Sequence, residues 1–159
     1  MKKINFILNN KMFKESLKKN RKCEESRKFC HHDLSHMLDT ARIAYIISLE
    51  DKLNLEKESI YAVALLHDIG RHKQYKENIP HDIASVEIAE EILKECGFEN
   101  CEIFNIIRAI KNHRNGYIEK DILSQIMYRA DKLSRRCFCC NALEECNWSQ
   151  EKKNYKLMY

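Results

Sequence analysis

Apolar residues recur at three- and four-residue steps along most of this chain, which is the period of an amphipathic α-helix. The clearest stripe begins at Leu34 and continues through Met37 and Ala41 to Ser48. Sheet folds built from many tight hairpins are excluded, because the 159 residues include only three Gly and one Pro for sharp turns. We therefore expect an all-α fold, a compact bundle of about six helices in which residues 1–159 form a single domain.

The expected helices are bounded by residues that start or stop helices. Asp33 is placed to cap the first core helix, and Gly70 is expected to supply a left-handed stop for the second. Pro80 suits the first turn of the third core helix, which Gly97 would end. The expected helical ranges are about 10–28, 34–48, 56–69, 80–97, 100–112 and 119–135, with a loop at 71–79, a turn at Asn115-Gly116 and a short tail helix at 141–146.

Basic residues are concentrated at the N-terminus. Residues 1–28 hold ten Lys or Arg against three Glu, a balance of +7, whereas the whole chain carries +4. Segment 1–29 is therefore expected to be a peripheral basic helix with a solvated face, and contact with nucleic acid or a membrane surface is the less favoured interpretation. The core is expected at 30–136 and a cysteine-rich tail at 137–159.

No segment has the length and hydrophobicity of a signal peptide, and none reaches the roughly 18 apolar residues that span a bilayer. The expected compartment is therefore the cytoplasm, with no membrane partner. Thiols stay reduced there, so the eight cysteines are expected to be free thiols or metal ligands rather than disulfides.

Half of the cysteines lie in one ten-residue stretch of the tail, 137–146. Cys137 and Cys140 have the spacing of one half of a zinc or iron–sulfur site, and Cys146 could add a third thiolate. Cys30 is the preferred fourth ligand, because a site shared with it would clasp the tail to the core. Free thiols, or a disulfide formed only after purification, remain the alternative.

Six candidate metal ligands lie in or at the ends of the expected core helices: His36, His67, Asp68, His81, His113 and Asp131. Ionisable groups on apolar helices are costly to bury unless paired, hydrogen-bonded or metal-bound, so a shared metal centre would explain them together. The alternative is that each histidine is an isolated, hydrogen-bonded core residue. His31, His32 and His72 lie outside the apolar stripes and are expected to be solvated.

Five segments add a more specific pattern, and they occur in the order SHMLDTARIAYII, ALLHDIGR, IPHDIASVEIAEEIL, IIRAIKNH and YRADKLSR. They resemble the HD-domain superfamily of metal-dependent phosphohydrolases over about residues 30–136. The resemblance implies a helical fold that holds a metal ion at His36, His67, Asp68 and Asp131. A two-metal branch of this family, which includes hydrolases of dinucleoside polyphosphates, adds two histidines. They fall here on His81 and His113, so that Asp68 could bridge two ions.

Such a centre would activate water to hydrolyse a phosphoester or phosphoanhydride, with Asp68 as the catalytic residue. One or two divalent transition metals are expected as cofactor, with Mn, Fe, Co, Ni and Zn all compatible with a histidine-rich site. The expected partner is a small phosphorylated substrate, with a nucleotide favoured. Candidate cations for its phosphates are Arg71, Lys111, Arg114, Lys132 and Arg135, although helix ends often carry exposed Lys and Arg.

The competing hypothesis is a non-catalytic HD-like module that senses a nucleotide or binds nucleic acid or protein. A module without catalysis has no physical need for a complete ligand set. Every position of the pattern is filled here, which favours the enzyme.

Overall fold

The structure is a computed structural model, and it describes residues 1–115 and 121–159. Helices are the only regular secondary structure in this part of the chain, and it contains no strand, which confirms the predicted all-α class. The α-helices are α1 (Lys2–Asn9), α2 (Lys11–Cys23), α3 (Leu34–Glu50), α4 (Lys57–Leu66), α5 (Arg71–Glu77), α6 (His81–Glu95), α7 (Asn100–Asn112) and α8 (Ile122–Leu133). Two short 3-10 helices follow, η1 (Cys137–Cys139) and η2 (Gln150–Lys152).

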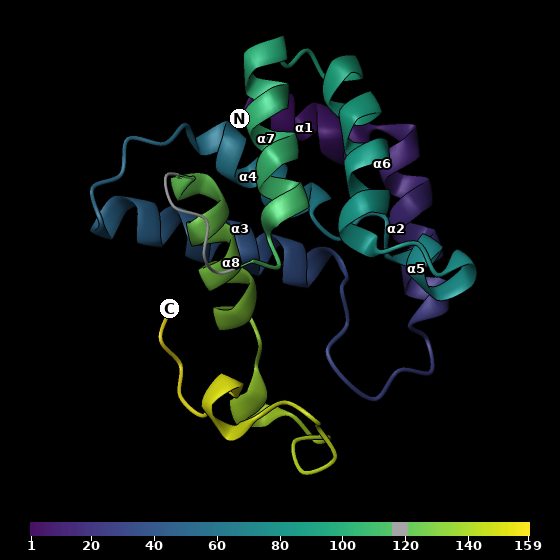
Figure 1. The fold of residues 1–159 in the computed structure, drawn as a ribbon, viewed down its shortest axis with the longest axis vertical. Helices are drawn as coiled ribbons and strands as arrows, with labels where there is room; N and C mark the ends of the chain where they lie inside the picture. Colours follow the sequence, from purple (N-terminus) through teal and green to yellow (C-terminus); the bar gives the residue numbers. More distant parts are fainter. Residues whose placement is uncertain (116–120) are drawn as a thin grey trace.

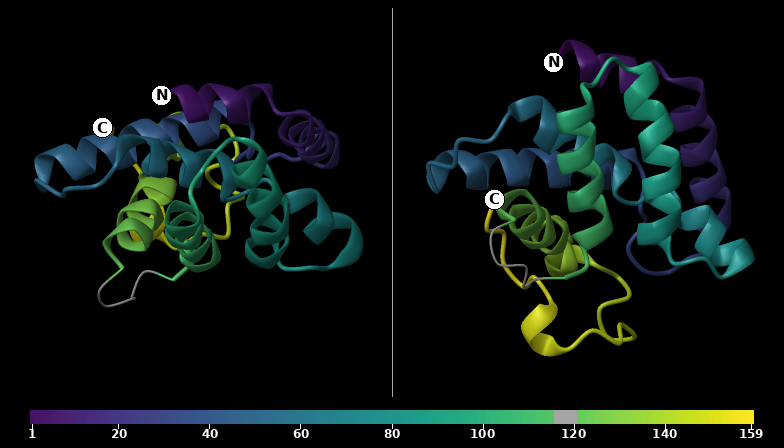
Figure 2. Two further views of the ribbon diagram at one scale, coloured as in Figure 1. Left: turned by 90° about the horizontal axis from the view of Figure 1, so that it is seen from above. Right: turned by 45° about the horizontal axis from the view of Figure 1, so that its top comes forward.

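The long helix α3 runs across the molecule and packs against α4 and α8 (Figure 1). Helices α6 and α7 form an antiparallel pair, and α7 also contacts α4 and α8. The N-terminal helices lie along the outer side of this pair, with α1 against α4 and α2 against α5 and α6 (Figure 2). The tail after α8 lies at one end of the molecule, away from α1 (Figure 1).

One apolar core joins side chains of α1 to α4 with those of α6, α7 and α8. Ile47, Leu65 and Ile106 at its centre are fully buried, and each such side chain contributes roughly 1.5–3 kcal/mol through removal from water. The N-terminal segment also contributes Ile7 and Phe13 to this core, although most of its other side chains are exposed or partly exposed on the outer side. The division of the chain into 1–29, 30–136 and 137–159 remains a prediction.

The N-terminal segment is two helices because Asn10 interrupts it. The Asn10 backbone is extended, and its side chain accepts a hydrogen bond from the Phe13 amide at 3.1 Å, which caps α2. Two other predicted helix boundaries agree with the structure. Asp33 caps α3 by accepting from the His36 amide, and Gly97 has a φ of 77° just beyond α6.

Gly70 is not the left-handed stop that the sequence suggested, since its φ is −90°. Its lack of a side chain serves a close approach of two backbones instead. A Cβ built on Gly70 would lie 2.5 Å from the Ala84 carbonyl carbon and 2.5 Å from the Ser85 amide nitrogen of α6. The Gly70 amide donates to Ser85 Oγ at 2.9 Å, which fixes the turn after α4 against α6.

Two expected connections also differ. The expected loop at 71–79 contains α5, a short polar helix that is held by contacts with α2 and α6 rather than by an apolar stripe of its own. The expected helix at 141–146 is a series of turns, and the helical turns of the tail are η1 and η2. The expected turn at Asn115-Gly116 includes Gly116, which lies outside the described residues.

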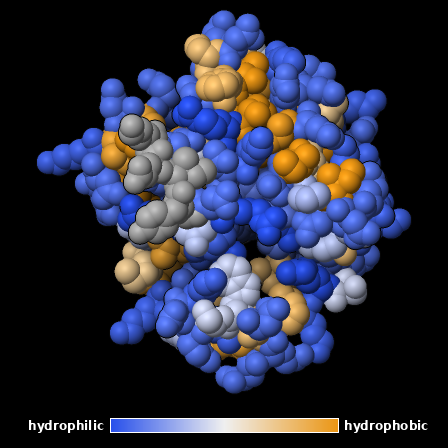
Figure 3. Space-filling view, in the orientation of Figure 1, coloured by the Kyte–Doolittle hydropathy of each residue, from blue (hydrophilic) through white to orange (hydrophobic). Residues whose placement is uncertain are grey.

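Among the helices that the structure describes, none combines the length and the hydrophobicity needed to cross a bilayer. The face shown in Figure 3 is mostly hydrophilic and is hollowed between the helices and the tail. Hydrophilic side chains surround this hollow.

Candidate metal centre

Asp68 lies at the middle of four imidazoles that come from different parts of the fold. Its carboxylate oxygens lie 3.8 Å from His36 Nε2, 3.3 Å from His67 Nε2, 3.2 Å from His81 Nε2 and 3.9 Å from His113 Nε2. We call these five residues, together with Asp131, the histidine–aspartate centre. All six residues that the sequence proposed as ligands therefore converge.

Asp131 completes one side of this centre. Its Oδ1 lies 3.4 Å from His36 Nε2 and 3.9 Å from His67 Nε2. Ligand atoms of His36, His67 and Asp68 lie within 4.8 Å of one another, and so do those of Asp68, His81 and His113. Asp68 belongs to both groups, as a residue that bridges two ions would.

The positions of these residues follow from where the helices begin and end. His36 and Asp131 project from within α3 and α8, whose axes pack together. His67 and Asp68 form the turn that follows α4, next to the close contact at Gly70. His81 is the first residue of α6, and His113 directly follows α7. Helix ends thus bring four of the six donors together.

Hydrogen bonds at Nδ1 set the tautomer of each imidazole. His67 Nδ1 donates to the carbonyl oxygen of Ala64 at 2.8 Å, and His113 Nδ1 donates to that of Ile110 at 2.6 Å. A carbonyl oxygen is only an acceptor, so both rings carry a proton on Nδ1. When either ring is neutral, its Nε2 is unprotonated and carries a lone pair that faces the carboxylates.

The other two imidazoles follow the same rule. His81 Nδ1 donates to Gln74 Oε1 at 2.5 Å. His36 Nδ1 lies 3.2 Å from Ser134 Oγ, whose hydroxyl donates to the Asp131 carbonyl and is therefore an acceptor toward His36. Such partners at the outer nitrogen are typical of metal-bound histidines, because they fix the ring and direct Nε2 inward.

Nitrogen lone pairs and carboxylate oxygens therefore face one another inside the histidine–aspartate centre without a positive charge between them. Nε2 of His36 and Nε2 of His67 are buried without a hydrogen-bond partner, although carboxylate oxygens are close. Nε2 of His81 and Nε2 of His113 face each other at 3.2 Å, where two lone pairs would repel. A cation between these nitrogens and the carboxylate of Asp68 would satisfy all of them, so the donor set fits a metal ion.

Burial keeps two of the imidazoles in the neutral form that binds metals. It lowers the pKa of His81 to about 3 and that of His113 to about 4. Burial also lowers the pKa of His67, but the charges of Asp68 and Asp131 outweigh it and raise the pKa above the usual value. The attraction that draws a proton to His67 would equally draw a metal ion.

Two histidines that were expected to be solvated are not. His32 Nδ1 lies 2.7 Å from Glu24 Oε1, and its Nε2 lies 3.9 Å from an Asp68 oxygen, so His32 borders the centre. His72 is buried against Asn20, whose side-chain amide donates to the Asp68 carbonyl at 2.9 Å. Neither residue lies on an apolar stripe, because tertiary contacts of α2 bury them.

A cavity of about 250 Å³ opens beside the histidine–aspartate centre, between it and the tail. Four of the five cations proposed for phosphate line it: Arg71, Arg114, Lys132 and Arg135. Lys111 is exposed on α7 and is not among the lining residues. The structure adds residues that the sequence did not indicate: Arg27, Phe29, Trp148 and Lys152. We call this space the central cavity.

One arginine of the central cavity has a donor to spare. Arg135 Nη1 is buried without a hydrogen-bond partner, whereas Arg71 Nε lies 3.4 Å from Glu24 Oε1. The Arg135 guanidinium lies on the Trp148 ring, with its central carbon 3.4 Å from the ring centroid. Because a guanidinium donates in a planar fork, unused N–H groups of this kind suit phosphate oxygens.

Glu24 is the acidic group that holds Arg71 and His32 in place. It is 2% exposed and accepts hydrogen bonds of 2.7 Å from both the His32 amide and the Tyr75 hydroxyl, while Arg71 Nε lies 3.4 Å away. Burial raises the pKa of Glu24, but the hydrogen bonds from His32 and Tyr75 outweigh it and lower the pKa to about 2. No sequence pattern singled out this residue.

Replacing Glu24 should therefore destabilise the protein in a pH-dependent way. A folded-state pKa below the ordinary value of 4.5 adds stability that is complete above pH 4.5 and is lost as the pH falls toward 2. We expect Glu24→Gln to lower the free energy of unfolding at pH 7 by about 2–3 kcal/mol, and by less at pH 3. Urea unfolding at both pH values measures this, with the exposed neighbour Glu25→Gln as control. Equal losses at both pH values would contradict the assignment.

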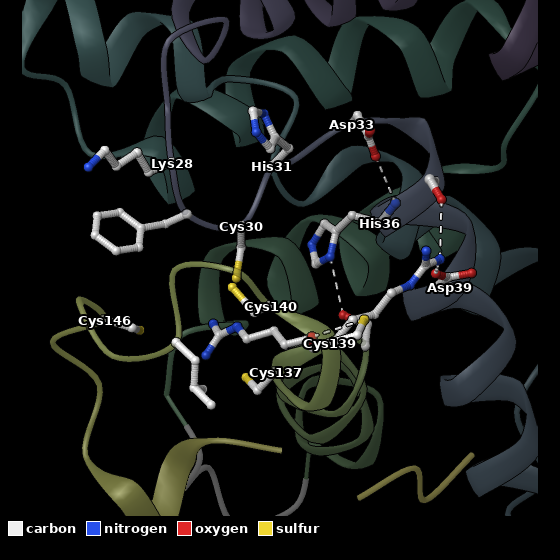
Figure 4. A pocket seen from close by; sticks show the side chains of 16 residues that line it. Lys28, Cys30, His31, Asp33, His36, Asp39, Cys137, Cys139, Cys140 and Cys146 are labelled. Atoms are coloured by element: carbon white, nitrogen blue, oxygen red, sulfur yellow. Dashed lines mark hydrogen bonds and ion pairs between the residues drawn. The ribbon is translucent and has the colours of Figure 1, made fainter. Parts of the chain in front are cut away.

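The cysteines proposed as ligands line a second cavity, which adjoins the central cavity (Figure 4). It is lined by Cys30, Cys137, Cys140 and Cys146 and also by Cys139. Cys30, Cys137 and Cys146 line the central cavity too, so the two proposed sites have different ligands but are neighbours.

Comparisons with known proteins identify the family of this chain. An uncharacterised protein of Clostridium beijerinckii is 48% identical over 159 residues, which is 100% of both chains. The Bacillus subtilis protein named "Putative phosphohydrolase YueE" is 30% identical over 115 residues, which cover 63% of this chain and 64% of that protein. The crystal structure of a "predicted HD superfamily hydrolase" from an uncultured Thermotogales bacterium matches the fold with a TM-score of 0.63 at 22% identity, over 88% of this chain and 80% of that one. The sequence profile of the HD domain matches residues 33–136, so this chain belongs to the HD-domain family.

Proposed function

We propose that this protein is a metal-dependent phosphohydrolase that cleaves a phosphoester or phosphoanhydride of a nucleotide or another small phosphorylated metabolite. One observation carries the proposal: inward-facing imidazole nitrogens and two carboxylates lie beside a cavity whose other walls carry arginine and lysine. The B. subtilis relative, whose name describes a phosphohydrolase, supports the same reaction class.

The residues that would hold the metal are His36, His67, Asp68 and Asp131, and His81 and His113 would hold a second ion together with Asp68. Such ions lower the pKa of bound water to roughly 7 and stabilise charge on phosphoryl oxygens. The mixture of imidazole and carboxylate donors suits Mn, Fe, Co, Ni or Zn.

The protein's own side chains would bind and orient the substrate. Arg71 is anchored to Asp68 at 3.3 Å and near Glu24 at 3.4 Å, so its fork is fixed at the edge of the metal centre. Arg135 lies on the ring of Trp148, and its Nη2 is 3.7 Å from Asp131 Oδ2. The two arginines thus border the metal ligands from α5 and from the segment after α8, where they can neutralise phosphate charge and hold the reacting phosphorus over the centre.

A nucleotide fits this cavity better than a bare phosphate ester. Phe29 and Trp148 line it beside the cations, so an aromatic base could lie against apolar or aromatic surface while its phosphates reach the metal centre. The proposed order places the base toward the tail and the phosphates toward Asp68.

The direct test is to measure bound metals and turnover in the same preparation. The purified protein should contain transition metal at the histidine–aspartate centre and should hydrolyse members of a panel of nucleotides and simple phosphate esters in the presence of Mn²⁺. Metal bound without turnover of any member would favour the non-catalytic sensing module.

Arg135→Ala should lower kcat/KM by about 10- to 100-fold, because a hydrogen bond to a charged group contributes roughly 1.5–3 kcal/mol. Metal content should stay unchanged, since Arg135 is not a ligand. Lys111→Ala is the matched control, as Lys111 is exposed and does not line the central cavity, and its kcat/KM should stay within about twofold. Equal losses in both variants would show that the central cavity does not bind the substrate.

A further inference from the structure

Five cysteines from two distant stretches of the chain line one cavity of about 320 Å³. Cys30 precedes α3, whereas Cys137, Cys139, Cys140 and Cys146 belong to the tail. Figure 4 shows the side chains of Cys30, Cys137 and Cys140 facing the same space, with Cys146 at its edge. We call this space the cysteine pocket.

The backbone of the tail is shaped to present these thiols together. A turn from Cys137 to Cys140 closes through a hydrogen bond of 3.2 Å from the Cys140 amide to the Cys137 carbonyl. The next turn closes from the Leu143 amide to the Cys140 carbonyl at 3.3 Å. Tight turns with two cysteines three residues apart are the usual half-site for zinc and for iron–sulfur clusters.

Cys30 and the tail cysteines share one pocket although they come from distant parts of the chain. Several thiols that line one space are a donor set of the kind that zinc and iron–sulfur clusters take.

Cys139 is different from the other four, although it adjoins the same pocket. Its Sγ lies 3.6 Å from the Arg136 carbonyl oxygen, the residue is exposed, and its side chain lies apart from the group around Cys30 (Figure 4). The chain therefore contains a cysteine within the same turn that is not aimed at the others. This makes Cys139 a matched control.

The tail buries little apolar surface. Ala142 is its one buried apolar residue, and Tyr155, Leu157 and Met158 are exposed, although Tyr159 packs partly buried against the core and Trp148 lies on Arg135. Asn154 Nδ2 donates to the carbonyls of Lys132 and Arg135 at 2.7 and 2.9 Å, which attaches the end of the tail to α8 and its following turn. A segment with so small a core usually depends on a disulfide or a metal for its structure.

We propose that Cys30, Cys137, Cys140 and Cys146 bind a second metal centre through their thiolates, distinct from the histidine–aspartate centre. The centre is either a Zn²⁺ ion or an iron–sulfur cluster, because both take four thiolate ligands. Among the described residues no three cysteine sulfurs lie within 4.8 Å of one another. A single Zn²⁺ would therefore draw the sulfurs inward, whereas a cluster would place its inorganic core between them. Either occupant ties the tail to the segment before α3.

The test measures zinc, iron and acid-labile sulfide per chain in protein purified without oxygen. It is done in the full-length Asp68→Asn background, so that ions of the histidine–aspartate centre do not contribute. A zinc site predicts about one zinc per chain, and a cluster predicts iron with equal sulfide and a brown colour. Cys140→Ser should remove most of this metal and Cys139→Ser should leave it unchanged. No zinc, iron or sulfide in the parent, or the same content in both variants, would overturn the proposal.

Thiol accessibility in the unmodified protein gives a second measurement that needs no cysteine variant. Alkylation counted by mass should leave the four proposed ligands unmodified in the native chain, together with the buried Cys96. Removal of the metal by a chelator or an oxidant of the cluster should make the four ligands reactive. Peptide mapping should identify Cys30, Cys137, Cys140 and Cys146, with Cys139 reactive throughout. Reaction of all five without metal removal would contradict the site. Since activity is not measured, this result is independent of the proposed hydrolase function.

Discussion

Asp68→Asn is expected to lose both the metal and the hydrolytic activity. Asp68 is the one residue shared by the two ligand groups, and its carboxylate faces all four imidazoles. An amide keeps the shape but removes the charge that would hold a cation. The metal supplies several kcal/mol of transition-state stabilisation, so turnover should fall at least about 10³-fold.

Metal analysis and turnover of the best substrate measure this loss, with unfolding followed in parallel. Asp51→Asn is a suitable control, because Asp51 is a half-exposed carboxylate that pairs with Arg129 at 2.9 Å on the surface. It should keep both metal and activity. An Asp68→Asn protein that retained both would place the active centre elsewhere.

Gly70→Ala is expected to be the most damaging small substitution for the fold. The new methyl group would lie 2.5 Å from backbone atoms of Ala84 and Ser85, and backbone cannot move aside as a flexible side chain can. This clash can be relieved only if α6 moves away from the turn that carries His67 and Asp68. We expect the free energy of unfolding to fall by more than about 3 kcal/mol, with loss of metal binding even where the chain still folds.

Gly97→Ala separates this steric effect from the conformational preference of glycine. Gly97 has a φ of 77°, but a Cβ there would meet no atom within 4 Å. Its replacement should cost only about 1 kcal/mol, through backbone strain alone. Urea unfolding of the two variants compares them. Similar losses would mean that the contact between Gly70 and α6 is less tight than described.

The sequence predicted the helices with strong periodicity well, because their burial repeats every three to four residues. The predicted helix at 100–112 coincides with α7, and Asp33 caps α3 as expected. The prediction from sequence failed where tertiary contacts determine the local structure. A glycine after a helix signals either positive φ or a close approach, and Gly70 is the second case. Helix α5 has too few apolar residues to be recognised without α2 and α6.

The candidate centre could be predicted because its ligands follow a family pattern, whereas its surroundings could not. His32 and Glu24 lie outside any such pattern, and α2 and the segment after it bring them to Asp68. Trp148 reaches the central cavity only because the tail turns back toward α8. A wall of the cavity built by an irregular tail leaves no periodic signal in the sequence.

The donors of the histidine–aspartate centre come from α3, the turn after α4, the start of α6, the turn after α7, and α8. An ion bound by all of them would cross-link segments up to about a hundred residues apart, so partial opening between these helices would first have to release it. At a free metal concentration 100 times its dissociation constant, binding adds about 2.7 kcal/mol to global stability. In a cell starved of that metal the chain would therefore be more exposed to proteolysis. Scarcity of the metal would lower the abundance of the protein as well as the occupancy of its metal site.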